Sequence, residues 1–138
     1  KDGYCSDMTR TFFCGEAPAE YAPIHDLVRR ANETAESIIR PGVRFCDIDR
    51  AARELIAEAG YGPYFNHRLG HSIGLQDHEP GDVSLANTAC VEEGMTFSIE
   101  PGVYLPGKFG VRVEDLVLVT KDGCEVLNHV DKNWKIIG

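Results

Sequence analysis

The 138-residue sequence lacks several features that would assign it to a familiar class. It has no run of eighteen apolar residues, so we expect no membrane-spanning helix and no membrane partner. It has no C-x-x-C pair, which leaves a zinc ribbon without support. Neither the G-x-S-x-G nucleophile motif nor the H-E-x-x-H zinc motif occurs. These absences argue against elbow-type serine hydrolases and ordinary zincins.

Positive charge is also scarce. The chain has 14 Lys and Arg against 22 Asp and Glu, with a net charge of −8. Phosphate binding needs clustered cations, so we expect no nucleic-acid partner. The run Gly102–Lys108 imitates a P-loop, but Phe109 stands where Ser or Thr must hold magnesium, so we expect no nucleotide site. The five cysteines are odd in number and scattered, which favours free thiols and a reducing, cytoplasmic location.

Apolar residues recur at helical spacing in two places and then give way to strand-like segments. We expect helices over 18–40, ended by Pro41-Gly42, and over 47–59, with Asp47 as the cap. Strands are expected over 9–14, 95–100, 111–119 and 125–127. Lys121-Asp122-Gly123 is typical of a hairpin turn. Two helices before non-local strands predict a single α+β domain over 1–138 with a mixed or antiparallel sheet.

Three segments concentrate the residues that could carry chemistry: 3–12, 66–79 and 98–115. They contain Asp7, His71, Glu100 and Glu114. Oxygen ligands with a single imidazole suit a divalent ion such as Mn²⁺, Co²⁺, Fe²⁺ or Zn²⁺. Two carboxylates able to bridge would hold two ions about 3.5–4 Å apart, as in two-metal hydrolases.

Each of these residues also has a structural alternative. Asp7 can cap a turn, and Glu100, forced out of helical geometry by Pro101, can end a strand and face solvent. Glu114 interrupts an apolar run, and strand alternation places it on the core-facing side, where a carboxylate needs a partner or a metal. Arg112 has the same parity, so a buried Arg112–Glu114 pair is the main alternative to metal ligation.

The wording of these segments resembles the pita-bread metallopeptidases, the family of methionine aminopeptidase, aminopeptidase P and Xaa-Pro dipeptidase. The matching motifs occur in the family's order and are Gly-Tyr-Cys-Ser-Asp-Met-Thr-Arg-Thr-Phe, Gly-His-Ser-Ile-Gly-Leu, His-Glu, Ile-Glu-Pro-Gly-Val-Tyr and Arg-Val-Glu-Asp. They are more similar to the prolidase and aminopeptidase P branch, and the resemblance covers nearly the whole chain. It implies a curved, mostly antiparallel pita-bread sheet with helices on its outer face.

The resemblance also implies a metal-ligand set. Asp7 and Glu114 are similar to the bridging carboxylates of the family, and His71 to its sole imidazole ligand. Glu100 is similar to the remaining glutamate ligand, which can also take the proton of the attacking water. The implied cofactor is a pair of divalent ions, Mn²⁺ first, with Co²⁺, Zn²⁺ or Fe²⁺ as other options.

Four more residues resemble the family's substrate-side groups. His78 is similar to the histidine that contacts the substrate and steadies the tetrahedral intermediate, which makes it, with Glu100, a predicted catalytic residue. His67 is similar to a histidine that lines the pocket beyond the scissile bond. Arg112 and Tyr104 are similar to supporting groups around the substrate. The implied substrate is a short peptide, with proline after the scissile bond.

One departure from the family pattern is large. The family has a further metal-binding aspartate eleven residues before the bridging one, and counting back from Asp7 runs past Lys1. We therefore expect the C-terminal part of a catalytic domain, with single or weak metal occupancy, little activity alone, and self-association, for example as a homodimer, through an exposed sheet edge. The alternatives are a non-catalytic peptide-binding module and a metal-independent, creatinase-like hydrolase. The four intact ligands favour the metallopeptidase.

Overall fold

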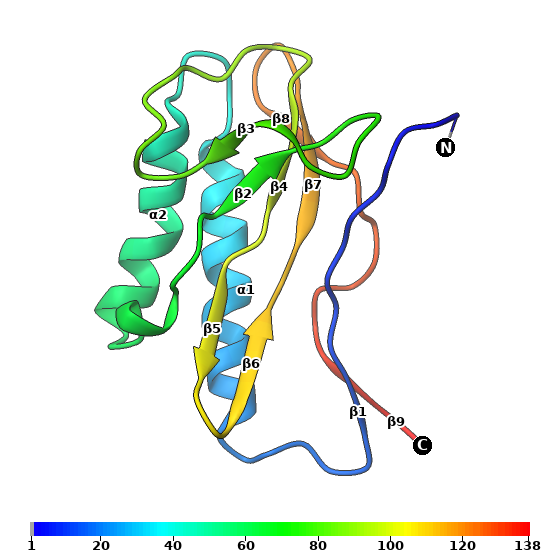
Figure 1. The fold of residues 1–138 in the computed structure, drawn as a ribbon. Coiled ribbons are helices and arrows are strands. Elements are labelled where there is room, and N and C mark those ends of the chain that lie inside the picture. The colour runs from blue at the N-terminus through cyan, green and yellow to red at the C-terminus, as the bar shows by residue number, and fades with distance from the viewer. Residues whose placement is uncertain (1) are drawn as a thin grey trace.

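The computed structural model describes residues 2–138 as an α+β assembly of two helices and a mainly antiparallel sheet (Figure 1). The helices are α1 (Tyr21–Ile38) and α2 (Phe45–Glu58), and a 3-10 turn spans Gly62–Tyr64. The strands are β1 (Phe12–Cys14), β2 (Gly70–Ser72), β3 (Glu79–Val83), β4 (Thr96–Ile99), β5 (Gly102–Leu105), β6 (Phe109–Arg112), β7 (Asp115–Val119), β8 (Cys124–Val126) and β9 (Lys135–Ile137). Within these residues neither helix is long and apolar enough to cross a membrane.

The main sheet has five strands in the order β3-β2-β4-β7-β8, and every neighbouring pair is antiparallel. A two-stranded hairpin, β5-β6, follows on from β4 and β7, and a separate parallel pair joins β1 to β9. Both helices lie on one face of the sheet (Figure 1). The predicted α+β class, the antiparallel sheet and the helices on one face are therefore confirmed.

The helices are held by the apolar stripes that predicted them. In α1, Ile24, Val28, Ala31 and Ala35 are buried at spacings of three and four residues against the sheet. The helix is shorter than expected, because Ile39 is already extended before the Pro41-Gly42 turn. In α2 the predicted cap is wrong: Arg44 is the cap residue, and the Asp47 carboxylate lies inside the first turn. There Asp47 pairs with Arg44 and Arg50 rather than with the helix backbone.

Two strand predictions need correction. The segment 9–14 forms a strand only from Phe12, and Thr9 makes an isolated bridge to Glu114. The segment 111–119 is not one strand, because β6 pairs with β5 and β7 pairs with β4. Glu114 is buried, as strand alternation predicted. The alternation does not continue along β7, however, because Val117 and Val119 are buried together with Leu116. In Figure 1 the helices cover one face of β7 while the two terminal segments run along the other. The hairpin turn at 121–123 is confirmed between β7 and β8.

A buried ion pair fastens the irregular segment before β2 onto α2. The carboxylate of Asp49 accepts hydrogen bonds from Arg53 and from the backbone N–H of Leu69. The Arg53 guanidinium also donates to the carbonyls of Phe65 and His67 and lies 4.1 Å above the Phe65 ring. These contacts therefore fix the position of the irregular segment, and of the start of β2, relative to α2.

Replacing Arg53 with Met should destabilise the fold strongly, because it leaves the fully buried Asp49 carboxylate without its cation. We expect urea unfolding to report a loss of about 3–5 kcal/mol, as for other broken buried pairs. Arg50→Met, on the same helix, removes only an exposed pair with Asp47 and should cost less than about 1 kcal/mol. Equal losses in the two variants would contradict this role for Arg53.

Candidate metal centre

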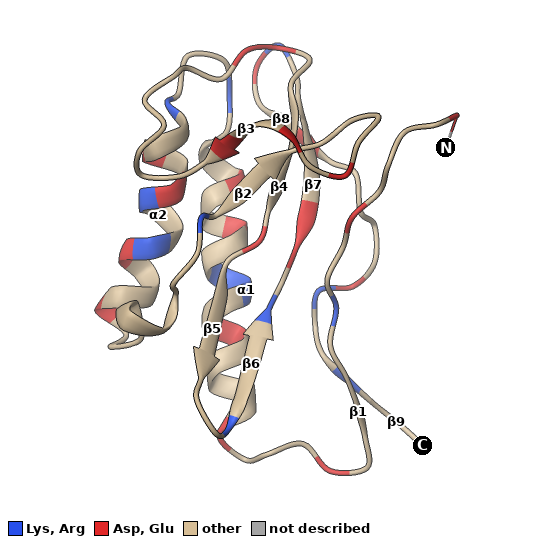
Figure 2. Cartoon of the chain, in the orientation of Figure 1, with Lys and Arg blue, Asp and Glu red and all other residues tan. Residues whose placement is uncertain are grey.

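The site lies where the β4-β7 pair gives way to the β5-β6 pair, and the break falls at facing positions on both sides. β4 is separated from β5 by Glu100-Pro101, and β6 is separated from β7 by Val113-Glu114. The flanking pairs Ile99–Asp115 and Gly102–Arg112 keep one antiparallel register across the gap, which places Glu100 opposite Glu114. Figure 2 shows acidic segments at both positions, between β4 and β5 and at the start of β7. Two carboxylates therefore face each other across a break in the sheet.

Two more predicted ligands meet these carboxylates. Asp7, His71 and Glu114 each offer one ligand atom, and the three atoms lie within 4.8 Å of one another. The Nε2 atom of His71 lies 3.6 Å from an Asp7 oxygen and 3.4 Å from an oxygen of Glu100. The structure thus brings all four predicted metal ligands together around one imidazole nitrogen. Their roles as ligands stay a prediction.

His71 is held so that Nε2 points at the carboxylates. It lies on β2, where its backbone N–H donates to the Ser98 hydroxyl at 2.9 Å, and that hydroxyl donates to Glu100 at 3.1 Å. On its other side, Nδ1 lies 3.2 Å from the Ser72 carbonyl. A proton on Nδ1 would donate to this carbonyl and leave the Nε2 lone pair for a cation, as in many histidine metal ligands. Gly70 allows the close approach, because a Cβ there would overlap the Ser98 carbonyl.

Glu114 is a buried carboxylate with other carboxylates nearby. Its side chain is only 4% exposed and accepts a hydrogen bond from the Thr9 hydroxyl. Burial raises its pKa to about 7; the Thr9 hydrogen bond opposes this shift, and the nearby Glu100 and Asp7 add to it. The guanidinium of Arg112 lies 3.6 Å away, but its own side chain is 42% exposed. The predicted Arg112–Glu114 pair is therefore present, with its carboxylate buried and its guanidinium partly in solvent.

The donor set fits a divalent cation. Three carboxylates and one imidazole converge, and within residues 2–138 the structure places one cationic group, Arg112, against Glu114. Such a cluster carries excess negative charge, which a doubly charged ion would neutralise. Oxygen and imidazole donors match Mn²⁺, Co²⁺, Fe²⁺ and Zn²⁺.

The alternative in which Glu100 ends a strand and faces solvent is wrong, because its side chain is 15% exposed and faces His71.

Comparison with known proteins agrees with this chemistry. The model of metallopeptidase family M24 matches residues 1–121. The chain belongs to this family. An uncharacterised peptidase of Staphylococcus aureus strain USA300 is 53% identical to this M24 chain over 129 residues, which are 94% of this chain and 37% of that peptidase.

Solved structures show the same similarity. The X-Pro aminopeptidase of Thermotoga maritima MSB8 superimposes with a TM-score of 0.95 and 40% identity, over 99% of this M24 chain and 39% of that one. The Xaa-Pro dipeptidase of Bacillus anthracis superimposes with a TM-score of 0.94 and 39% identity. The match covers 98% of this M24 chain and 38% of the dipeptidase. The M24 chain thus spans 37–39% of the length of these relatives, and its pita-bread fold is that of the matching part.

The predicted substrate-side residues of the M24 chain fall into two groups. The exposed His78 ring lies 4.0 Å from the His71 ring, and its Nδ1 is 3.2 Å from the Asp77 carboxylate. His67, Tyr104 and Arg112 instead form a row that ends at the cluster. The His67 and Tyr104 rings are 5.5 Å apart, and the Tyr104 hydroxyl is 3.5 Å from Arg112. Both groups border the metal ligands, and their contact with substrate stays a prediction.

Sequence reasoning missed two hydroxyl residues of the site. Thr9 donates to Glu114 and accepts from Arg112 at 3.0 Å, and Ser98 connects His71 to Glu100. Each lies two positions from a predicted ligand, Thr9 from Asp7 and Ser98 from Glu100. Since residues two apart in extended chain share a face, this spacing was the available signal.

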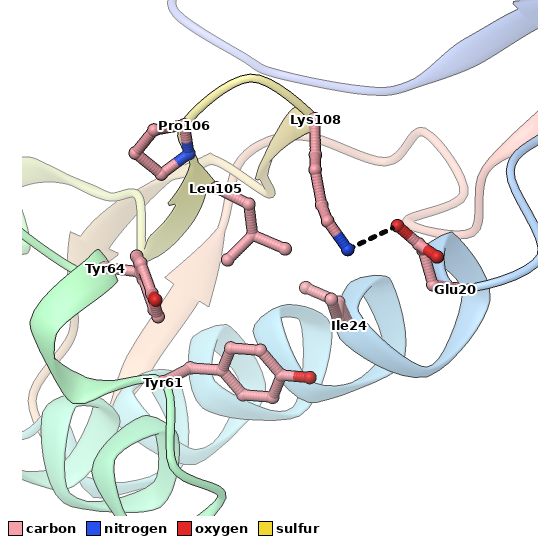
Figure 3. A pocket seen from close by; sticks show the side chains of 7 residues that line it. All are labelled: Glu20, Ile24, Tyr61, Tyr64, Leu105, Pro106 and Lys108. Carbon is pink, nitrogen blue, oxygen red and sulfur yellow. Dashed lines mark hydrogen bonds and ion pairs between the residues drawn. The ribbon is translucent and has the colours of Figure 1, made fainter.

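A pocket of about 330 Å³ lies elsewhere, at the N-terminal end of α1 (Figure 3). A 3.0 Å ion pair between Lys108 and Glu20 crosses its edge. Its lining residues are Glu20, Ile24, Tyr61, Tyr64, Leu105, Pro106 and Lys108. None of these is a predicted site residue, so the site has to be recognised by its chemistry rather than by the size of a cavity.

The pKa of Glu114 makes stability depend on pH in metal-free buffer. Between its ordinary value near 4.5 and about 7, the folded chain holds a proton that the unfolded chain releases. The free energy of unfolding should therefore fall as pH rises through this window, by on the order of 2–3 kcal/mol. Urea unfolding at several pH values in the presence of a chelator measures this fall.

Glu114→Gln should remove most of that fall, because the amide does not titrate. Glu125→Gln, on the exposed side of β8, should keep it. The assignment of the fall to Glu114 is wrong if Glu114→Gln and the unaltered chain show the same slope.

Proposed function

We propose that the protein is a metal-dependent exopeptidase that cleaves short peptides before a proline residue. The observation that carries the proposal is the convergence of Asp7, Glu100 and Glu114 on the Nε2 atom of His71 at the break in the sheet. Because this M24 chain spans 37–39% of its relatives' length, the activity is proposed for the whole protein. Cation binding is proposed for these residues themselves.

Asp7, His71, Glu100 and Glu114 would hold the cation, and we propose Mn²⁺ because the set is rich in carboxylate oxygens. A bound divalent cation acidifies a water molecule and polarises the peptide carbonyl. These four residues offer one complete cation site. We therefore expect the 138-residue chain to bind one divalent ion tightly.

The chain's own side chains supply the proton transfers and the hydrogen bonds. The Glu100 carboxylate, oriented by the Ser98 hydroxyl, is placed to take a proton from the attacking water. The exposed His78 imidazole, beside His71, can donate a hydrogen bond to the carbonyl oxygen as negative charge develops on it. Arg112 and Tyr104 offer a guanidinium and a hydroxyl along the row that leads to His67, where the substrate would lie.

The preference for proline is proposed from the relatives. Solved structures similar to this chain are named X-Pro aminopeptidase, Xaa-Pro dipeptidase and prolidase, at 39–40% identity. A non-catalytic module or a metal-independent hydrolase would leave three converging carboxylates with the half-exposed Arg112 as their cationic neighbour. This convergence of like charges favours the metal-dependent enzyme over both.

Calorimetric titration with Mn²⁺ tests the cation site directly. We expect one tight ion per chain, and His71→Ala should weaken binding by more than the about 10–100-fold that is typical of lost supporting contacts. Asp122→Ala removes an exposed side chain at the β7-β8 turn and is the control, with unchanged affinity. Equal affinity in His71→Ala would contradict the site, and two tight ions per chain would contradict its single occupancy.

Hydrolysis assays on the whole Mn²⁺-loaded protein test the substrate class. Xaa-Pro peptides should be cleaved in preference to matched Xaa-Ala peptides, and His78→Ala should lower kcat by about 10²–10³-fold with little change in KM. Cleavage that ignores proline would leave the metal site standing but refute the specificity.

Self-association is a further proposal. Phe12, Ile136 and Ile137, on the β1-β9 pair, are about half exposed, although apolar. Exposed apolar strand residues favour pairing with another chain. Light scattering should therefore show dimers or larger species, and a monodisperse monomer at high concentration would contradict the proposal.

A further inference from the structure

The segment Asn128–Lys132 connects β8 to β9 and lies outside the residues matched by the M24 model. It has no regular secondary structure. Its polar groups nevertheless reach three separate parts of the fold: the N-terminal segment, β7 and α1. Each of these contacts leads, directly or through one partner, to a predicted carboxylate ligand or to its neighbour in the chain.

The first contact is made by Asn128. Its side-chain oxygen accepts a hydrogen bond from the Leu116 backbone N–H at 2.6 Å, and its side-chain nitrogen donates to the backbone carbonyl of Asp7 at 3.2 Å. One amide side chain thus fixes the backbone of Asp7 relative to β7. Asp7 precedes the first strand, and this contact adds to the backbone bridge between Thr9 and Glu114 two residues further on.

The second contact runs through Arg10, whose side chain is almost fully buried. The carbonyls of Val130 and Asp131 accept hydrogen bonds from its guanidinium at 2.9–3.1 Å. The same guanidinium donates to the Glu114 backbone carbonyl at 2.8 Å and to the Asp115 carboxylate at 2.6 Å. The segment therefore orients the cation that grips the backbone at Glu114.

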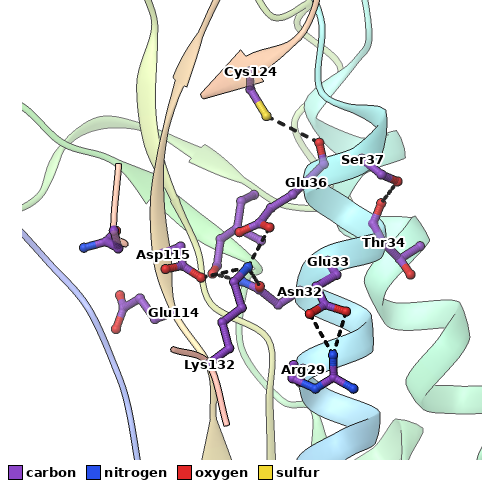
Figure 4. Close-up of polar contacts among 12 residues, drawn as sticks. Arg29, Asn32, Glu33, Thr34, Glu36, Ser37, Glu114, Asp115, Cys124 and Lys132 are labelled. Atoms are coloured by element: carbon purple, nitrogen blue, oxygen red, sulfur yellow. Dashed lines mark hydrogen bonds and ion pairs between the residues drawn. The ribbon is translucent and has the colours of Figure 1, made fainter. Parts of the chain in front are cut away.

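The third contact is made by Lys132, which reaches across to α1 (Figure 4). Its ammonium donates to Asn32 at 2.6 Å and Glu36 at 2.7 Å, and lies 3.0 Å from Asp115. Asn32 in turn donates to the Ile99 carbonyl at 2.9 Å, one residue before Glu100. Lys132 is therefore coupled to the residues next to both facing glutamates.

The charges of this network balance only when Lys132 is present. Asp115 is fully buried, Glu36 is 10% exposed and Lys132 is 18% exposed. Burial raises the pKa of Glu36, and the ammonium of Lys132 opposes that shift. Without Lys132, Glu36 would lose its cation, and Asp115 would keep only its contact with Arg10. An uncompensated buried charge is costly, so the loss of Lys132 should disturb the backbone beside Glu100 and Glu114.

We propose that Asn128–Lys132 is a positioning segment for the divalent cation, with Asn128 setting Asp7 and Lys132 setting Glu100 and Glu114. This inference rests on the proposed metal site. Neither residue touches the cluster of ligand atoms, so each acts through its neighbours. Supporting residues of this kind typically change metal affinity by about 10–100-fold when removed.

The test compares Mn²⁺ affinity in four variants by titration calorimetry. Lys132→Met and Asn128→Ala should each bind Mn²⁺ about 10–100-fold more weakly than the unaltered chain. Lys132→Arg, which keeps the cation, should retain most of the affinity. Lys121→Met, at the exposed β7-β8 turn, is the matched control and should bind as the unaltered chain does.

Glu36→Gln tests whether Lys132 acts by positioning the ligands rather than by its contact with α1. Glu36→Gln alters the α1 end of the network but keeps the ion pair between Lys132 and Asp115. If Lys132 positions ligands, Glu36→Gln should bind Mn²⁺ within about threefold of the unaltered chain, a small change beside the loss of a supporting contact. Manganese paramagnetic resonance spectra should change in Lys132→Met and not in Glu36→Gln.

The outcomes are distinct. If the unaltered chain binds no Mn²⁺, the proposed metal site fails and this inference falls with it. If the unaltered chain binds Mn²⁺ and both Lys132→Met and Asn128→Ala bind it equally well, the metal site stands and the positioning role is overturned. If Lys132→Met does not fold, Asn128→Ala and Lys132→Arg still decide the question.

Discussion

The constraint on which the site depends is the placement of two glutamates opposite each other at a break in the antiparallel ladder. Paired strands bring side chains of one face to within about 4.5–5.5 Å, and like charges placed so are destabilising. Here Glu100 and Glu114 occupy such positions, with Asp7 beside them, at the edge of a buried region. The surrounding structure holds these charges together against their repulsion.

It does so with two sets of contacts. On the ligand side, the Thr9 and Ser98 hydroxyls donate to Glu114 and Glu100, and Arg112 faces Glu114 from solvent. Behind the ligands, Arg10 and Lys132 neutralise Asp115 in the core. These cations thus lie behind or beside the carboxylates rather than among them.

Much of this could be predicted from the sequence, for identifiable reasons. Apolar spacing located both helices to within three residues at each end, and the turn residues at 121–123 located one hairpin. The strands β2, β3, β5 and β9 were missed, because the first three contain glycine and show no alternation, and β9 is short. The four residues that converge at the predicted metal site were recognisable from their motifs. The contacts of Asn128 and Lys132 were not, because each residue meets partners about a hundred positions away.

The shared register across the break also sets where the chain can change length. The pairs Ile99–Asp115 and Gly102–Arg112 belong to one long hairpin, whose tip is the turn at 106–108. An extra residue at the tip lengthens a surface loop and leaves the register intact. One inserted between the tip and either glutamate shifts every side chain on that arm to the opposite face. Insertions and deletions among homologues of this region should therefore gather at the tip and be absent from the two arms.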